Sequence, residues 1–146
     1  MNKIKRSIII NAPVDKVFNY VSNYQNWPEF YKGLSDVKPI TENTRATGSK
    51  FIYKVKMLGV NFTVGTEFRD FRENEGWNGK SFKGIEHKTL WFFKNSNGKT
   101  EFTHGLSYKI PWYMGGKMYD NLLGRKSWTK IIEISLQNAK KIIEKT

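Results

Sequence analysis

The final thirty or so residues of the chain constrain its fold more than any other segment. Apolar side chains recur there at intervals of three or four positions. They are Trp128, Ile131, Ile132, Leu136, Ala139, Ile142 and Ile143. Side chains at this spacing share one face of an α-helix, so the segment is predicted to form one long helix with an apolar stripe. Because one helix cannot bury its own stripe, the preceding residues must supply the surface on which it packs.

Residues 47–68 predict part of that surface as a β-hairpin. Apolar side chains alternate with lysines in residues 47–57, as in a strand with one buried face. Leu58-Gly59 is predicted to form a two-residue turn, and residues 60–68 return as the second strand. In this register Val55 faces Phe62, so the apolar residues of both strands meet on one side.

The other residues up to Pro111 predict five further strands and two short helices. The strands are expected at residues 3–10, 34–41, 76–82, 85–93 and 102–110, and the helices at residues 13–22 and 28–32. Four aromatic residues between positions 24 and 31 are expected to plug one end of the sheet. The order predicts an α+β helix-grip fold, in which a curved antiparallel sheet of about seven strands wraps around the long C-terminal helix. No repeat or linker interrupts it, so residues 1–146 are expected to form a single domain.

Composition narrows the classes of function. The chain has no cysteine, which excludes disulfides and thiolate chemistry, and no stretch resembles a signal peptide or a membrane span. We therefore expect a soluble, cytoplasmic protein.

The net charge of +12 predicts attraction to polyanions, but the lysines are spread along the sequence without a recognition motif. No specific nucleic-acid partner is predicted, and a basic module acting on the ribosome or RNA is kept as an alternative.

Residues 8–37 carry a resemblance to a known superfamily. They read IIINAPVDKVFNYVSNYQNWPEFYKGLSDV. The pattern is an apolar strand, an Ala-Pro helix start followed by Val17, Phe18 and Val21, and then Trp27-Pro28. This pattern resembles the opening of the START-like superfamily, also called SRPBCC, especially its polyketide cyclase/dehydrase and lipid-transport branch. The resemblance implies a cavity between the sheet and the long helix, usually for an apolar ligand. It implies no reaction, because one fold hosts many functions.

The inward faces of the predicted elements supply the candidate wall of that cavity. The candidates are Phe51, Tyr53, Phe62, Val64, Trp91, His104, Leu106 and Tyr108 from the strands, with Trp128 and Ile132 from the long helix. Such a wall suits a small hydrophobic ligand, such as a lipid, a polyketide or an isoprenoid-like molecule. One or two polar groups are enough to orient it. Binding, with transport as an extension, is therefore the function that the sequence favours.

Two histidines, His87 and His104, fall on this otherwise apolar face. The predicted register places them within a residue or two of each other. They could be satisfied structural groups, or they could orient a ligand or act as acid and base in a cyclase or dehydratase reaction, with His104 as the central group. Tyr53, Tyr108 and Thr89 could assist as donors. No acidic third ligand falls beside the histidines and no cofactor motif is present, so neither a metal nor a cofactor is expected.

Three large residues, Trp112, Tyr113 and Met114, precede the long helix, and basic residues flank them on both sides. As core residues they would need no further explanation. If they are exposed, they would form an apolar tip suited to transient contact with an anionic membrane.

Overall fold

A computed structural model describes residues 2–116 and 124–146. In this part of the chain a seven-stranded antiparallel sheet has the order β1-β7-β6-β5-β4-β3-β2. Its strands are β1 (Asn2–Ile10), β2 (Leu34–Pro39), β3 (Lys50–Met57), β4 (Val60–Arg72), β5 (Gly76–Lys83), β6 (His87–Ser96) and β7 (Lys99–Tyr108). The helices are α1 (Val14–Ser22), α2 (Trp27–Phe30) and α4 (Arg125–Glu144), with short 3-10 turns at Tyr24–Asn26 and Trp112–Met114.

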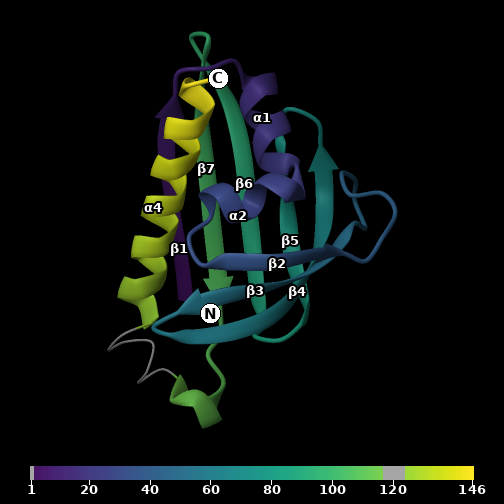
Figure 1. The fold of residues 1–146 in the computed structure, drawn as a ribbon, viewed down its shortest axis with the longest axis vertical. Helices are drawn as coiled ribbons and strands as arrows, with labels where there is room; N and C mark the ends of the chain where they lie inside the picture. Colours follow the sequence, from purple (N-terminus) through teal and green to yellow (C-terminus); the bar gives the residue numbers. More distant parts are fainter. Residues whose placement is uncertain (1, 117–123) are drawn as a thin grey trace.

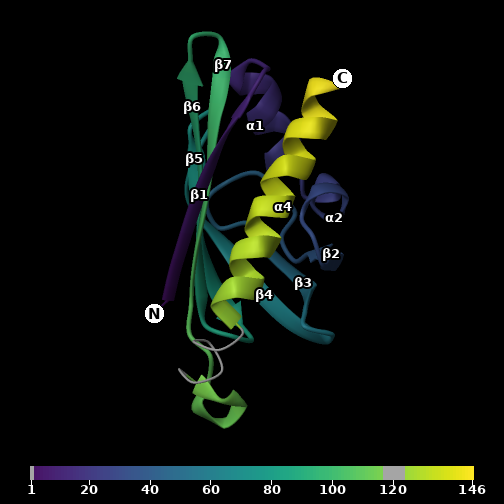
Figure 2. The same ribbon diagram turned by 90° about the vertical axis from the view of Figure 1, so that its left-hand side faces the viewer.

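The sheet is strongly curved. In Figure 1 the strands β2, β3 and β4 run across the strands β1, β7, β6 and β5 at a large angle. Figure 2 shows α1, α2 and α4 on the same side of the sheet, and its other face is left uncovered by helices. The predicted α+β helix-grip architecture is therefore confirmed.

The predicted hairpin forms as expected. Val55 pairs with Phe62 and Tyr53 pairs with Val64 in the β3–β4 register. Leu58 and Gly59 both have positive φ, at 52° and 78°, as a two-residue hairpin turn with the twist of the flanking strands requires. The strand β3 begins at Lys50, three residues later than predicted, and β4 extends to Arg72.

The long C-terminal helix is confirmed over Arg125–Glu144, and its predicted continuation into residues 117–123 lies outside the described residues. Its apolar stripe is buried, with Ile132 and Ala139 at 0% exposure. The helix lies along β1 (Figures 1 and 2). Each fully buried isoleucine on this stripe contributes about 1.5–3 kcal/mol relative to exposure, so burial of the stripe holds the helix on the sheet.

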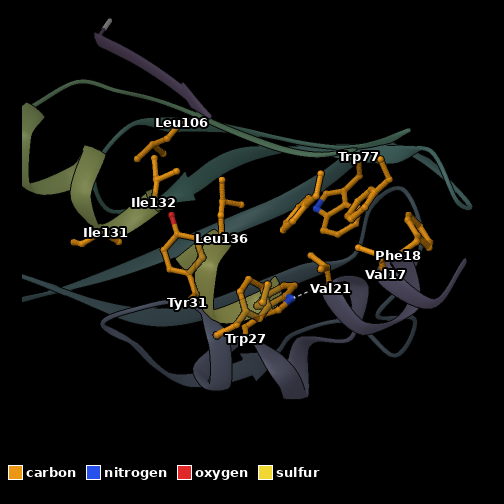
Figure 3. Close-up of a cluster of buried hydrophobic side chains, with 14 of the residues drawn as sticks. Val17, Phe18, Val21, Trp27, Tyr31, Trp77, Leu106, Ile131, Ile132 and Leu136 are labelled. Carbon is orange, nitrogen blue, oxygen red and sulfur yellow. Dashed lines mark hydrogen bonds between the residues drawn. The ribbon is translucent and has the colours of Figure 1, made fainter. Parts of the chain in front are cut away.

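The two short helices cover the opposite part of the concave face. Phe18 of α1 is fully buried and meets the rings of Trp77 and Phe93 edge-on, at centroid distances of 5.8 and 5.3 Å. The indole N–H of Trp27 donates to the carbonyl of Val21 over 2.8 Å, which ties α2 to α1 (Figure 3). The helix α2 begins one residue earlier than predicted and ends at Phe30. These contacts position Tyr31, the residue after α2, against the sheet.

None of the helices in the described ranges is long and apolar enough to cross a bilayer.

Candidate functional site

A cavity of about 80 Å³ lies between the concave face of the sheet and the helices. Its wall is largely aromatic and aliphatic, and the described residues that line it include no charged side chain. Eight of the predicted wall residues line it: Tyr53, Phe62, Val64, Trp91, His104, Leu106, Tyr108 and Trp128. The sequence therefore located the concave side of the sheet from strand parity alone.

Two predicted wall residues lie elsewhere. Phe51 is fully buried, and its ring lies 4.8 Å from that of Trp27 and 5.0 Å from that of Phe68. It has the expected parity, but the segment around α2 covers this end of β3 and places Phe51 behind the wall. Ile132 is also fully buried and belongs to the hydrophobic core around Leu136 (Figure 3).

The cavity is nearly filled by its own side chains. Its volume is well below the roughly 300–1,000 Å³ of typical ligand pockets, and about half that of an engineered cavity of about 150 Å³ that admits benzene. Large rings occupy the space, among them Trp27, Tyr31 and Trp91. A ligand of the size of benzene or larger must therefore displace some of these rings or move α4 away from the sheet.

Tyr31 and His104 form the first polar pair of the wall. The Tyr31 hydroxyl lies 3.0 Å from His104 Nε2, and His104 Nδ1 lies 3.1 Å from the carbonyl of Leu90. Because a carbonyl only accepts, Nδ1 carries the proton in the neutral ring, and Nε2 accepts from Tyr31. The imidazole also stacks on Trp91, at a ring-centroid distance of 3.8 Å. Burial lowers the pKa of His104 to about 4 and raises the pKa of Tyr31, so both groups are neutral at pH 7.

A second polar group links β3, β4 and β6. The Tyr53 hydroxyl lies 2.8 Å from Thr66 Oγ1, which lies 2.7 Å from His87 Nε2. His87 Nδ1 is 2.7 Å from the carbonyl of Ile85, so by the same reasoning Nδ1 donates and Nε2 accepts from Thr66. Burial lowers the pKa of His87 and raises that of Tyr53. This group is neutral at pH 7 as well.

The prediction that the two histidines lie within a residue or two of each other is wrong. They share the concave face, but His87 pairs with Tyr108, and His104 pairs with Trp91, four residues further along β6. Each histidine therefore has its own partner from another strand or from the α2 segment. They do not form a joint acid-base pair.

Trp128 of α4 adds a polar atom without a partner. Its indole N–H is buried and makes no hydrogen bond to any described residue. Since Trp128 lines the cavity, the wall carries a donor that no described residue satisfies.

The segment after β7 carries an exposed apolar tip. Trp112 is 87% exposed and Tyr113 is 71% exposed, while the side chain of Met114 lies outside what the structure describes. The tip projects beyond the lower end of the sheet in Figures 1 and 2. A surface groove beside it shares four lining residues with the cavity, namely Phe62, Ile85, Tyr108 and Ile110. The tip therefore lies next to the end at which the cavity meets the surface.

The sequence profile described as "Polyketide cyclase / dehydrase and lipid transport" matches residues 1–144. The chain belongs to this family. The resemblance found in residues 8–37 is thus confirmed over almost the whole chain. No curated protein matched the sequence.

Solved structures with the same fold share little of this chain's sequence. A protein from Thermus thermophilus has a TM-score of 0.82 at 14% identity, and each chain is covered to 97%. The Zhui aromatase/cyclase of a Streptomyces species has a TM-score of 0.78 at 11% identity, covering 99% of this chain and 94% of its own. A START superfamily protein from Mycobacterium smegmatis has a TM-score of 0.69 at 13% identity, with 98% and 94% covered. At such identities the likeness concerns the fold.

The neutral, buried His104 predicts a pH dependence of stability in this family member. Its pKa is about 4 in the folded chain and near 6.5 when exposed, so the unfolded chain binds more protons between these values. The free energy of unfolding should therefore fall as the pH drops from about 6.5 to 4, by roughly 3 kcal/mol. His87, with its lowered pKa, acts in the same direction. Urea denaturation at pH 7 and pH 4, compared with His104→Phe, isolates the effect, and an equal loss in both proteins would contradict it.

Within the described residues no cluster of three or more metal-ligating side chains occurs.

Proposed function

We propose that this chain binds one small, neutral, hydrophobic molecule between the sheet and α4, and carries it between membranes. The observation that supports this most is the uncharged wall. No lysine, arginine, aspartate or glutamate lines the cavity among the described residues. Both histidines are held neutral by burial, and their ring nitrogens are already hydrogen bonded. A charged ligand would lose its hydration without a compensating charge, whereas a lipid, polyketide or isoprenoid-like molecule loses little.

The exposed tip supports the membrane part of the proposal. Trp112 and Tyr113 are side chains that prefer the interface between lipid and water, and they stand next to the cavity end. Lys109, Arg125 and Lys126 are exposed in the neighbouring segments, where they can contact anionic headgroups. A tip of two rings gives transient contact, as a carrier that must leave the membrane requires.

A transfer assay tests the proposal. The probe is a pyrene-labelled fatty alcohol moving from donor to acceptor vesicles that contain phosphatidylserine. The wild-type protein should accelerate transfer, and the double variant Trp112→Ala and Tyr113→Ala should slow protein-mediated transfer about tenfold, because it loses interfacial area. Uptake of the probe in solution should be unchanged.

The matched control is Phe92→Ala, which removes an exposed ring, 44% accessible, from another part of the surface. It should leave transfer unaffected. Failure of the wild-type protein to accelerate transfer would count against carriage, and equal slowing by both variants would count against a role of the tip.

An enzymatic role of the cyclase or dehydratase kind is the second candidate. The 3.0 Å contact between the Tyr31 hydroxyl and His104 Nε2 favours it, because a phenol next to an imidazole can pass a proton. However, a histidine with a pKa of about 4 is a weak base at pH 7. Loss of turnover of a polyketide substrate in His104→Ala, with ligand uptake retained, would favour the enzyme over the carrier.

A further inference from the structure

Ligand binding in the cavity does not explain the net charge of +12, because the described residues that line the cavity are uncharged. Part of that charge gathers on the outer face of the sheet, the face without helices in Figure 2. A hollow of about 470 Å³ lies there, and five basic residues line it: Lys3, Lys5, Arg69, Lys80 and Lys88. Asp70 is the one acidic residue among the described residues of its lining. The hollow is therefore positively charged, although its basic residues come from segments that are far apart in the sequence.

Strand register places these cations side by side. Lys80 of β5 pairs with Lys88 of β6, Lys88 pairs with Ser107 of β7, and Ser107 pairs with Lys3 of β1. Three lysines thus share one row across four neighbouring strands. Like charges directly opposite each other on a sheet lower stability, so the chain keeps this row at a cost.

The nearby carboxylates do not neutralise the row. Glu67, opposite Lys80, forms its ion pair with Arg69 at 3.1 Å. Asp70 accepts a hydrogen bond from Asn78 at 3.3 Å. In the described residues Lys80 and Lys88 have no carboxylate within ion-pair distance, so their charges are free for an anionic partner.

An exposed ring stands on the same face. Phe92 lies four residues beyond Lys88 on β6 and has the same outward parity, with 44% of its surface exposed. Cations that follow a phosphate backbone and an aromatic ring that stacks on a base are the two elements by which proteins hold single strands. A flat bilayer fits less well, because this face is turned sideways from the Trp112–Met114 tip in Figure 2.

We propose that the outer face of β1, β7, β6 and β5 binds single-stranded nucleic acid, with the lysine row on the phosphates and Phe92 stacked on a base. The interaction does not require sequence readout. It goes beyond the carrier function and does not depend on it, because the cavity opens on the other face of the sheet.

The test measures anisotropy of a fluorescein-labelled 20-mer of oligouridylate between 50 and 200 mM salt. The three lysines of the row on phosphates predict a slope of log affinity against log salt of about −2. Lys88→Glu should weaken binding about tenfold at low salt and reduce the slope by about 0.7. The same variant replaces a like-charge pair with an opposite pair beside Lys80, so its melting temperature should rise by about 1–3 °C. Weaker binding by a more stable protein cannot result from misfolding.

Phe92→Ala should weaken binding about tenfold without changing the salt slope, because it removes stacking and no charge. Lys130→Glu is the matched control, since it makes the same charge change at an exposed position of α4. Lys130→Glu should reduce the affinity for the oligonucleotide much less than Lys88→Glu does. Equal weakening by Lys130→Glu, or no binding by the wild type at 50 mM salt, would overturn the proposal. So would binding to phosphatidylserine vesicles that depends on Lys88 while the oligonucleotide stays unbound.

Discussion

Val64→Phe is expected to weaken uptake of a neutral apolar probe by about 10- to 100-fold while the chain stays folded. Val64 lies on the wall at the centre of the β3–β4 hairpin, so a phenyl ring at this position enters the cavity of about 80 Å³. A ligand must then expel the ring, which forfeits the roughly 1.5–3 kcal/mol gained by burying a phenylalanine side chain. Titration with N-phenyl-1-naphthylamine, whose fluorescence rises in apolar surroundings, measures the loss.

Val60→Phe is the matched control. Val60 lies on the same strand, is 49% exposed and does not line the cavity. The same substitution there should leave probe affinity unchanged. Undiminished uptake by Val64→Phe would show that the probe binds elsewhere on the protein.

Phe51→Ala is expected to lower the free energy of unfolding by about 3–5 kcal/mol, the usual cost of deleting a buried phenylalanine ring. Phe51 is fully buried and packs against Tyr24, Trp27 and Phe68, which connect the α2 segment to the sheet. The ring therefore supports the wall from behind. Urea denaturation measures the effect.

Ile40→Ala serves as the reference, because Ile40 is 53% exposed and its truncation should change stability by no more than about 0.5 kcal/mol. A loss below about 1 kcal/mol in Phe51→Ala would mean that the ring is not part of the core. Loss of probe uptake in Phe51→Ala at temperatures where the protein is folded would indicate that Phe51 contacts the ligand, as the sequence predicted.

The sequence predicted those parts of the fold that depend on local periodicity. Strand alternation and the Leu58-Gly59 turn determine the β3–β4 register, and the spacing of Trp128, Ile132 and Leu136 determines the buried face of α4. Tyr31 was missed as a wall residue, because periodicity does not say how a short helix packs on a sheet. The four aromatics between positions 24 and 31 were the available signal.

The error over the histidines arose from the β6–β7 register. Asn97 and Gly98, with φ of 53° and 83°, form a two-residue turn, and Ser96 pairs with Lys99. Counting from this turn places His104 opposite Trp91 and leaves His87 near the other end of the strand pair. The two histidines stay on the same face of the sheet after any shift of the register by an even number of residues, but the distance between them changes with the shift.

The row of lysines on the outer face could not be predicted from the sequence. Lys3 is far in sequence from Lys80 and Lys88, so the positive charge looks evenly spread along the chain. The pairing of β1 with β7, β7 with β6 and β6 with β5 brings these lysines into one row. Only the order β1-β7-β6-β5 reveals the row.

Native mass spectrometry of the gently purified protein tests the central claim most directly. The account predicts a defined apolar adduct that is lost on denaturation, recovered by solvent extraction and absent from Val64→Phe prepared in the same way. A bare polypeptide mass, unchanged after incubation with N-phenyl-1-naphthylamine or a fatty alcohol, would contradict the claim that the cavity opens to hold a ligand.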